Sequence, residues 1–263
     1  MYTSSEEKTI YTMGIDVGSI TTKAALMRDG LLYASKVIFT GYNVEAAAGR
    51  VYEDVLSAAN ITAEQVRRII ATGYGRKGVS MAHGTLTEIL CHAAGAYHQN
   101  PEIRFIIDIG GQDSKAILLD DNGKVGNFTM NDKCAAGTGR FLEVMARALE
   151  VNLEDFGDLS LKASEPAKIS SLCTVFAESE VISLIAKGAP REDIVAGIHE
   201  AIGTRVAAMA KRIGLRGPVM MTGGVAKNKG VVKALAEKLA VPVMVSPYAQ
   251  INGALGAACL AWK

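Results

Sequence analysis

The sequence contains no long apolar run. No stretch of about 18 or more apolar residues occurs in its 263 residues, and the first residues include no apolar core of signal-peptide length. Charge of one sign is also missing, because 28 Lys and Arg stand against 27 Asp and Glu. Bulk electrostatics therefore give no indication of nucleic acid or of an anionic membrane as a partner. We expect a cytoplasmic protein without a membrane span.

Proline and cysteine are scarce. Six prolines against 27 glycines favour tight turns with close ligand approach over disorder. Four cysteines argue against a disulfide framework in a cytosolic-looking chain of this size. Any special cysteine should therefore be a metal ligand or a nucleophile.

Two common nucleotide-binding signatures are missing or out of context. The P-loop pattern G-x-x-x-x-G-K-[ST] does not occur. Residues 73–78 read GYGRKG, a literal G-x-G-x-x-G, but a dinucleotide fingerprint would open directly into a helix, and here VSMAHGT follows. Neither a P-loop fold nor a dinucleotide-binding fold is therefore expected.

An internal repeat organises the chain. Residues 14–27 read GIDVGSITTKAALM and residues 106–119 read IIDIGGQDSKAILL, so that Asp16 aligns with Asp108. Each copy has an apolar strand, a glycine turn and a second apolar strand, which predicts a β-hairpin. Segments with apolar spacing near 3.6 follow each hairpin and predict helices.

The repeat predicts two α/β lobes related by pseudo-symmetry. The first lobe should comprise residues 1–99 and 251–263, and the second residues 100–250. The final segment, QINGALGAACLAW, has small residues on one helical face and should pack very closely, as a helix between lobes would. Further strands are expected at Ile69–Thr72, Val219–Thr222 and Val243–Val245.

The glycine turns suit a polyphosphate, because backbone N–H groups can approach it without an intervening side chain. Asp16, at a strand end, is placed to hold a hydrated magnesium ion. Asp108 and Gln112 join it as candidate catalytic residues, Gln112 by orienting water. The expected phosphate contacts are Gly18, Ser19, Ile20, Thr21, Thr22 and Lys23 in the first turn, and Gly110, Gly111, Gln112 and Asp113 in the second.

Two further glycine-rich segments are candidates for nucleotide contacts. The run MTGGVAKNKG from Met221 predicts a strand, a Gly-Gly turn and a helix, where a nucleoside can lie against the backbone. The run AAGTGR opens another helical pattern, although a basic helix cap without a ligand is the alternative for Arg140. The residues concerned are Gly223, Gly224, Val225, Asn228 and Gln250, and Gly137, Thr138, Gly139 and Arg140.

The order IDVGSITTK, IDIGGQDSK, TGGVAKN and NGALGAA resembles the phosphate-1, phosphate-2, adenosine and second connecting motifs of the actin/hexokinase/Hsp70 superfamily. This resemblance covers nearly the whole chain. It implies a duplicated, ribonuclease-H-like α/β fold in which two lobes hold ATP or ADP, with magnesium, in the cleft between them.

Two of the four cysteines differ in context from the other two. Cys134 and Cys173 each precede a helical pattern, where a thiolate is stabilised by free N–H groups and the helix dipole. Cys91 and Cys259 lie within apolar helical patterns and should be core residues. A 4Fe-4S cluster needs about four thiolates, which two chains contributing a pair each would supply, but no C-x-x-C pattern makes this site specific.

The segments MNDKCAAGTGRFLEVMA and CTVFAESEVIS, with ATGYGR and IDIGGQDSK, resemble the activators of 2-hydroxyacyl-CoA dehydratases, which group with the ATPase subunits of benzoyl-CoA reductase. The resemblance spans essentially the full length and departs from the expected pattern at Ile20 and Leu172. It implies a homodimer with one 4Fe-4S cluster between subunits, held by Cys134 and Cys173 of each chain.

The resemblance also implies a mechanism. Ferredoxin or flavodoxin would reduce the cluster, and ATP binding and hydrolysis would drive one low-potential electron onto an iron-sulfur dehydratase. Three alternatives remain: a reductase of a double-cubane-cluster protein in the same family, a small-molecule kinase of the same fold, and an ATP-dependent switch. The kinase would not need Cys134 or Cys173, and the switch would need a client-binding domain for which the chain has little room.

Overall fold

The computed structural model describes residues 9–170 and 173–262; Leu172 lies outside the described residues. The chain divides into two compact units. Unit 1 comprises Met1–His98 and Ile251–Lys263, and unit 2 comprises Gln99–Gln250.

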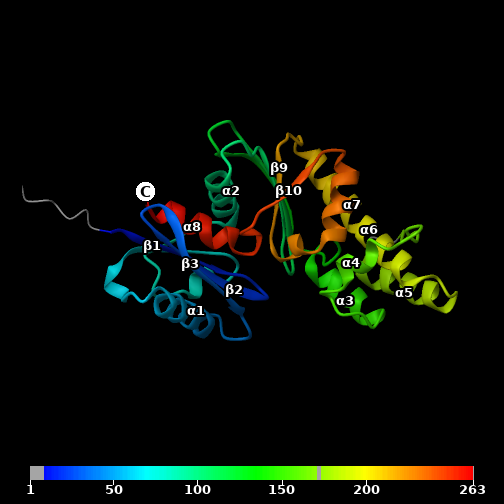
Figure 1. Ribbon diagram of the computed structural model, residues 1–263, viewed down its shortest axis with the longest axis horizontal. Coiled ribbons are helices and arrows are strands. Elements are labelled where there is room, and N and C mark those ends of the chain that lie inside the picture. Colours follow the sequence, from blue (N-terminus) through cyan, green and yellow to red (C-terminus); the bar gives the residue numbers. More distant parts are fainter. Residues whose placement is uncertain (1–8, 171–172, 263) are drawn as a thin grey trace, which may run out of the picture. The chain divides into compact units, whose positions relative to one another are not determined.

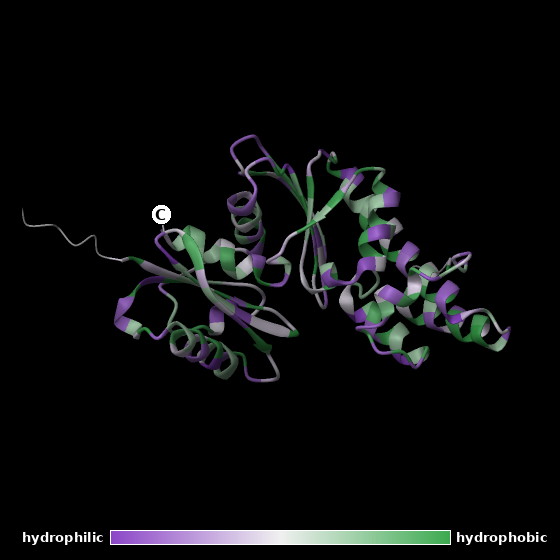
Figure 2. Ribbon diagram, viewed as in Figure 1, coloured by the Kyte–Doolittle hydropathy of each residue, from purple (hydrophilic) through white to green (hydrophobic). Residues whose placement is uncertain are grey.

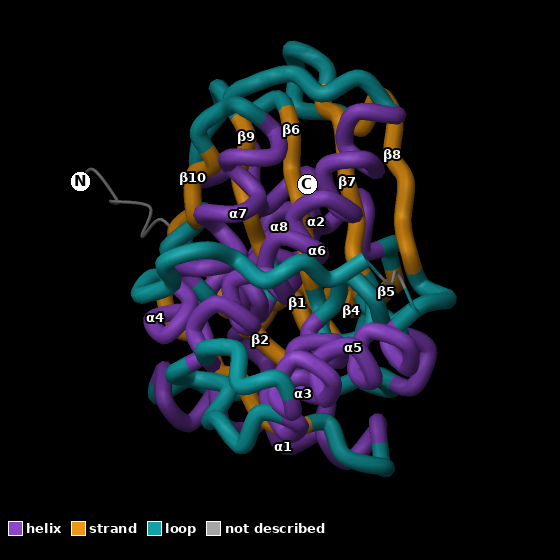
Figure 3. The backbone as a smooth tube through the Cα atoms, turned by 90° about the vertical axis from the view of Figure 1, so that its right-hand side faces the viewer, coloured by secondary structure: helices purple, strands orange, loops and turns teal. Residues whose placement is uncertain are grey.

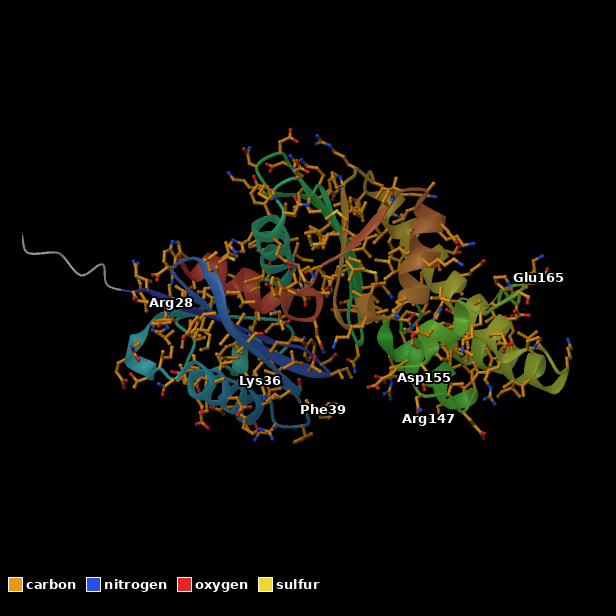
Figure 4. The ribbon with its side chains drawn as sticks, viewed as in Figure 1. Arg28, Lys36, Phe39, Arg147, Asp155 and Glu165 are labelled. Carbon is orange, nitrogen blue, oxygen red and sulfur yellow. The ribbon has the colours of Figure 1, made fainter. Side chains whose placement is uncertain are left out.

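Unit 1 is built on a five-stranded mixed sheet in the order β3-β2-β1-β4-β5. The first three strands form an antiparallel meander, and β4 and β5 run parallel to β1. The outer strand β3 leaves Lys36 and Phe39 exposed (Figure 4). The bounds are β1 Tyr11–Val17, β2 Thr21–Arg28, β3 Leu31–Phe39, β4 Val66–Thr72 and β5 Gly84–Thr85.

Helices cover both faces of this sheet (Figure 1). Helix α1 (Val44–Ala59) packs on one face, begins at the N-cap Asn43 and ends at Asn60 in the left-handed conformation. Helices α2 (Glu88–Gln99) and α8 (Asn252–Trp262) cover the other face. Two short 3-10 turns complete the unit: η1 Ala63–Gln65 and η2 Arg76–Gly78.

Helix α8 packs as closely as its small residues predict. A Cβ on Gly14 of β1 would overlap the carbonyl oxygen of Ala254, and one on Gly256 would overlap the carbonyl oxygen of Cys91. Because neither position has room for a methyl group, glycine lets α8 lie directly on β1 and α2. The C-terminal segment is thereby anchored in unit 1.

Unit 2 repeats the same sheet topology. Its strand order is β10-β9-β6-β7-β8, again a meander of three strands beside two parallel ones (Figure 3). Hydrophobic residues colour the central strands green (Figure 2). The bounds are β6 Phe105–Ile109, β7 Ser114–Leu119, β8 Val125–Asn131, β9 Val219–Thr222 and β10 Val243–Val245.

Five helices and two 3-10 turns accompany this second sheet within the described residues. The longest, α6, buries an apolar stripe against the sheet and against α7, and α3 packs against α5. The bounds are α3 Gly139–Ala148, α4 Phe156–Ser160, α5 Thr174–Ala186, α6 Arg191–Arg212, α7 Lys229–Leu239, η3 Gly224–Lys227 and η4 Ala249–Ile251.

The expected hairpins, helices and extra strands are confirmed, and β9 and β10 have the predicted bounds. The third strand of each meander, β3 and β8, was not foreseen. Neither strand contains a fully buried residue, and both lack a clean apolar alternation. The signal that could have found β3 is the Asp29-Gly30 pair, which occupies the left-handed region in the β2–β3 turn.

Candidate functional site

The repeated hairpins place an Asp and a Lys directly opposite one another. Asp16 pairs in register with Lys23 across β1 and β2, and Asp108 pairs with Lys115 across β6 and β7. In both hairpins the Lys Nζ lies 3.2 Å from the Asp Oδ2. The aligned residues of the sequence repeat therefore form the same ion pair in each unit.

The repeat extends to a Thr-Gly step that sequence reasoning missed. Thr72 ends β4 in register with Asp16, and Thr222 ends β9 in register with Asp108. The next residues, Gly73 and Gly223, have φ of +85° and +88°. A Cβ on Gly73 would overlap Asp16 Oδ1, so only glycine allows the chain to turn against the carboxylate. The GYGRKG segment is thus the counterpart of TGGVAK, and no α-helix follows it directly.

The two Asp–Lys pairs differ in their surroundings. Lys115 has a 2% exposed side chain and also contacts Asp113, at 2.8 Å, while Thr222 Oγ1 donates to Asp108 Oδ1 at 2.8 Å. Among the described residues Asp16 has one partner, Lys23, whose side chain is 14% exposed. Asp16 therefore has a carboxylate oxygen free for a hydrated cation, whereas Asp108 and Lys115 are enclosed in a buried charge network.

The turn of the first hairpin is tied to the start of β2 and to Thr40, which directly follows β3. Gly18 N donates to Thr21 O at 3.1 Å, and Gly18 O accepts from Thr40 Oγ1 at 2.8 Å. Thr22 is buried against Thr40, with 2.9 Å between the hydroxyl oxygens, so its side chain supports the turn. Ser19 is exposed, and Ile20 and Thr21 are half-buried.

The turn of the second hairpin is tied to helix α3. Gly110 N donates to Asp113 O at 2.9 Å. In the other direction, Gly139 N donates to Gly110 O at 2.9 Å and Arg140 N donates to Gly111 O at 2.8 Å. The first amides of α3 are therefore occupied by carbonyl groups of the turn. Gln112 projects from the turn and is exposed.

The Gly-Gly segment has an exposed backbone at Gly224, and the residues after it are held by the fold. No atom lies within 4 Å of a Cβ built on Gly224, so this backbone is open to a ligand. Val225 is buried. Asn228 is instead committed to the fold, because its Oδ1 caps α7 by accepting from Val231 N at 3.1 Å. Gln250 accepts from Lys227 Nζ.

His199 supports Asn228 from helix α6. Its Nε2 lies 3.3 Å from Asn228 Nδ2, and its ring packs edge-on against Phe156. Burial lowers the pKa of His199 to about 3, because the apolar surroundings disfavour the charged form. The ring is therefore neutral and accepts a hydrogen bond from the amide.

The prediction that Cys134 directly precedes a helix is wrong. Helix α3 begins at Gly139, and Gly137, with φ of +85°, and the extended Thr138 separate it from the cysteine. Asn131 Nδ2 fixes this loop by donating to Cys134 O at 2.8 Å and to Ala136 O at 3.0 Å. The partly exposed Cys134 thiol is held by a loop instead of a helix terminus.

The other cysteines are placed as predicted. Cys173 is exposed and is the N-cap residue of α5. Cys91 is buried in α2, and burial raises the pKa of its thiol to about 12, so it stays protonated. Cys259 is half-buried and contacts Met27 in the unit 1 core.

A scan against family models matches residues 13–261 to the BadF/BadG/BcrA/BcrD ATPase family. The chain belongs to this family. It is 46% identical to the 2-hydroxyisocaproyl-CoA dehydratase activator of Clostridioides difficile, covering 96% of this chain and 95% of that one. It is 49% identical to the activator of lactoyl-CoA dehydratase of Anaerotignum propionicum, covering 97% and 98%. The predicted resemblance to dehydratase activators is confirmed.

Solved structures of this family support the fold. Component A of (R)-2-hydroxyglutaryl-CoA dehydratase from Acidaminococcus fermentans matches with a TM-score of 0.93 at 48% identity, covering 96% of this chain and 98% of that one. The C. difficile activator with bound ADPNP matches with a TM-score of 0.91 at 46% identity, covering 96% and 94%. The predicted actin/hexokinase-like ATPase fold is confirmed.

The donor set of this family member restricts any iron-sulfur site. Over residues 9–170 and 173–262, no group of three or more His, Cys, Asp or Glu side chains could hold a metal ion. Cys134 and Cys173 offer two accessible thiols, half of what a 4Fe-4S cluster needs. They fit a cluster only if a second chain supplies the other pair.

In the same described part of the chain, no helix is long and apolar enough to span a bilayer.

Proposed function

We propose that this chain is an ATP-dependent activator of a 2-hydroxyacyl-CoA dehydratase and passes it one electron from a 4Fe-4S cluster shared by two copies of the chain. The observation that carries the proposal is the close, full-length similarity to dehydratase activators, in a chain that keeps two accessible thiols, Cys134 and Cys173. The cluster would supply one low-potential reducing equivalent when bound. Ferredoxin or flavodoxin is the proposed reductant.

Nucleotide binding would depend on both hairpin turns and the Gly-Gly segment. Asp16 is proposed to hold hydrated magnesium, because one of its oxygens has no partner among the described residues. Lys23, partly exposed beside it, can move onto a phosphate oxygen. Gly224 would lie against the nucleoside, and Gln112 would orient water. In unit 2, Asp108 would hold the second turn in place through Lys115.

A surface on α5 fits a second copy of the chain. Only Ala177 and Val181 of this helix are buried, while Val175, Phe176 and Ile182 are 66%, 65% and 55% exposed. An uncovered apolar helix face is typical of an interface. Because Cys173 is the N-cap residue of α5, pairing two such helices would bring thiols of both chains together.

Helix α3 can transmit the state of the phosphate turn to both cysteines. Its first amides bond the carbonyl groups of Gly110 and Gly111. The loop of Cys134 leads directly into it, and α3 packs against α5, which Cys173 caps. A shift of the turn on ATP binding or hydrolysis would therefore move both thiols.

The test is anaerobic purification followed by iron and sulfide analysis, an absorption spectrum and a measurement of mass in solution. We expect a brown dimer with about four irons per two chains, bleached by Cys134→Ser or by Cys173→Ser. Cys259→Ala is the matched control and should keep the iron. ATPase activity and activation of a 2-hydroxyacyl-CoA dehydratase are then measured on the same samples.

A colourless protein that still binds ATP would reject the electron-transfer proposal and leave a kinase of the same fold as the better account. An iron-loaded dimer that activates no dehydratase, but reduces a double-cubane-cluster protein, would change the partner and keep the mechanism.

A further inference from the structure

Arg205, on helix α6, has a positively charged side chain with no partner in the part of the chain that the structure describes. No hydrogen bond or ion pair joins its side chain to another residue of 9–170 or 173–262, and its Nε is buried. An arginine side chain keeps its positive charge and offers five N–H donors. Leaving such a donor buried and unpaired lowers stability. An unpaired arginine in such a position is therefore a candidate for binding a ligand.

The position of Arg205 indicates that reason. Its Cδ would lie 3.0 Å from a Cβ on Gly137, and its Nε 3.7 Å, so the side chain lies against the loop between Cys134 and α3. One helical turn further along α6, Met209 accepts a weak hydrogen bond from Ser114 of the second hairpin, at 3.9 Å. Arg205 thus lies on the stretch of α6 that serves both the cysteine loop and the phosphate turn.

The three amides of the loop that lie next to α3 are already used within the protein. Thr138 N donates to Ala135 O at 3.0 Å, and the amides of Gly139 and Arg140 donate to the turn of the second hairpin. The amides at the start of α3 cannot therefore bind an anion without breaking these bonds. A cationic side chain next to the loop can donate to an anion instead of these amides, and Arg205 contacts the loop at Gly137.

We propose that Arg205 binds an anion beside the loop from Cys134 to Arg140. Two sources share this chemistry: a phosphate group of the nucleotide, and the iron-sulfur cluster with its thiolate ligands. The inference rests on the proposed function, because both anions belong to it. It adds a residue that neither the motifs nor the repeat singled out.

The test compares Arg205→Met with wild type. Methionine keeps an apolar stem to pack on Gly137 but removes the positive charge and the buried Nε donor. The melting temperature of the protein free of nucleotide and cluster should stay the same or rise by about 2 °C or more. Arg147→Met is the control, since Arg147 is exposed in the last turn of α3 (Figure 4) and should change neither stability nor binding.

Ligand measurements distinguish the two sources. If a phosphate is bound, Arg205→Met should weaken ADP or ATP binding about tenfold to a hundredfold in calorimetry, with AMP less affected. If the cluster is the anion, nucleotide affinity should stay the same and the midpoint potential of the bound cluster should fall, because a nearby cation stabilises the more negative reduced form. Arg205→Lys should restore part of either effect.

Two results would overturn the assignment. One is a drop in melting temperature for Arg205→Met, partly restored by Arg205→Gln, which would make the residue a packing element. The other is unchanged nucleotide affinity together with an unchanged midpoint potential. A wild-type protein that binds neither nucleotide nor iron would instead reject the proposed function, so the two failures can be told apart.

Discussion

The two Asp–Lys pairs should respond very differently to loss of their lysine. Lys115→Met removes a cation with a 2% exposed side chain that lies 3.2 Å from Asp108 and 2.8 Å from Asp113. The buried Asp108 and the partly exposed Asp113, whose side chain is 27% exposed, would then both lose this cation. Breaking such a buried pair costs about 3–5 kcal/mol of unfolding free energy. For a chain of this size the melting temperature should fall by about 6–20 °C.

Lys23→Met is the matched control at the equivalent position. Lys23 is 14% exposed, and among the described residues it pairs with one carboxylate, Asp16, one oxygen of which has no partner there. We expect a loss of only about 1–2 kcal/mol. Because Lys23 is the cation proposed to reach phosphate, this variant should show the larger drop in nucleotide affinity.

The assay is urea unfolding of both variants without nucleotide, since a bound ligand would stabilise the native state. Adding Asp108→Asn and Asp113→Asn to Lys115→Met should recover part of the lost stability, because the unpaired charges are removed with their partner. Equal losses for Lys115→Met and Lys23→Met, within about 0.5 kcal/mol, would refute the argument that the buried pair is structural and the exposed pair is free to act.

Three further predictions follow from individual residues. Gly223→Ala places a Cβ against a β6 carbonyl oxygen at a residue with positive φ. Nucleotide affinity measured by calorimetry should therefore fall at least tenfold. Gly217→Ala, where a Cβ has open space, is the control and should leave nucleotide affinity unchanged. His199 is neutral in the folded protein, with a pKa of about 3, but gains a proton in the unfolded chain below pH 6.5. The free energy of unfolding should therefore fall with decreasing pH, by about 2 kcal/mol at pH 5. Urea unfolding curves of His199→Gln that keep the full pH dependence would contradict this. In the cluster-free protein, a thiol reagent at pH 8 should label Cys173 quickly and Cys91 only after unfolding, because burial raises the Cys91 pKa to about 12. Mass spectrometry of the labelled peptides identifies which cysteine has reacted.

Local patterns were sufficient to predict most of the secondary structure. The alignment of Asp16 with Asp108 predicted two equivalent hairpins, since a strand, a glycine turn and a second strand are encoded within a few neighbouring residues. The strand, Gly-Gly turn and helix pattern similarly predicted α7, Lys229–Leu239. Family-specific motifs predicted the activator resemblance in the same way, because they are contiguous in the chain.

Contacts between distant segments were beyond the reach of these patterns. The Thr-Gly step beside each aspartate is short and separated from it by many residues, so its role emerges only when β4 and β9 lie alongside β1 and β6. The Cys134 loop was taken for a helix start, because a run with two glycines does not reveal that Gly137 adopts a left-handed conformation. The spacing of residues in the sequence does not determine the φ of an individual glycine.

The sequence by itself determined the duplication and the order of the hairpins and main helices, and it indicated candidate residues for phosphate and metal, since all of these depend on short-range patterns of residue type. Tertiary structure alone decided which of two identical Asp–Lys pairs is enclosed, because burial of Lys115 comes from Asp113, Thr222 and the packing around them. It also decided that Asn228 caps a helix and that Arg205 Nε has no hydrogen-bond partner among residues 9–170 and 173–262. Burial and pairing are set by neighbours that meet only in the folded chain.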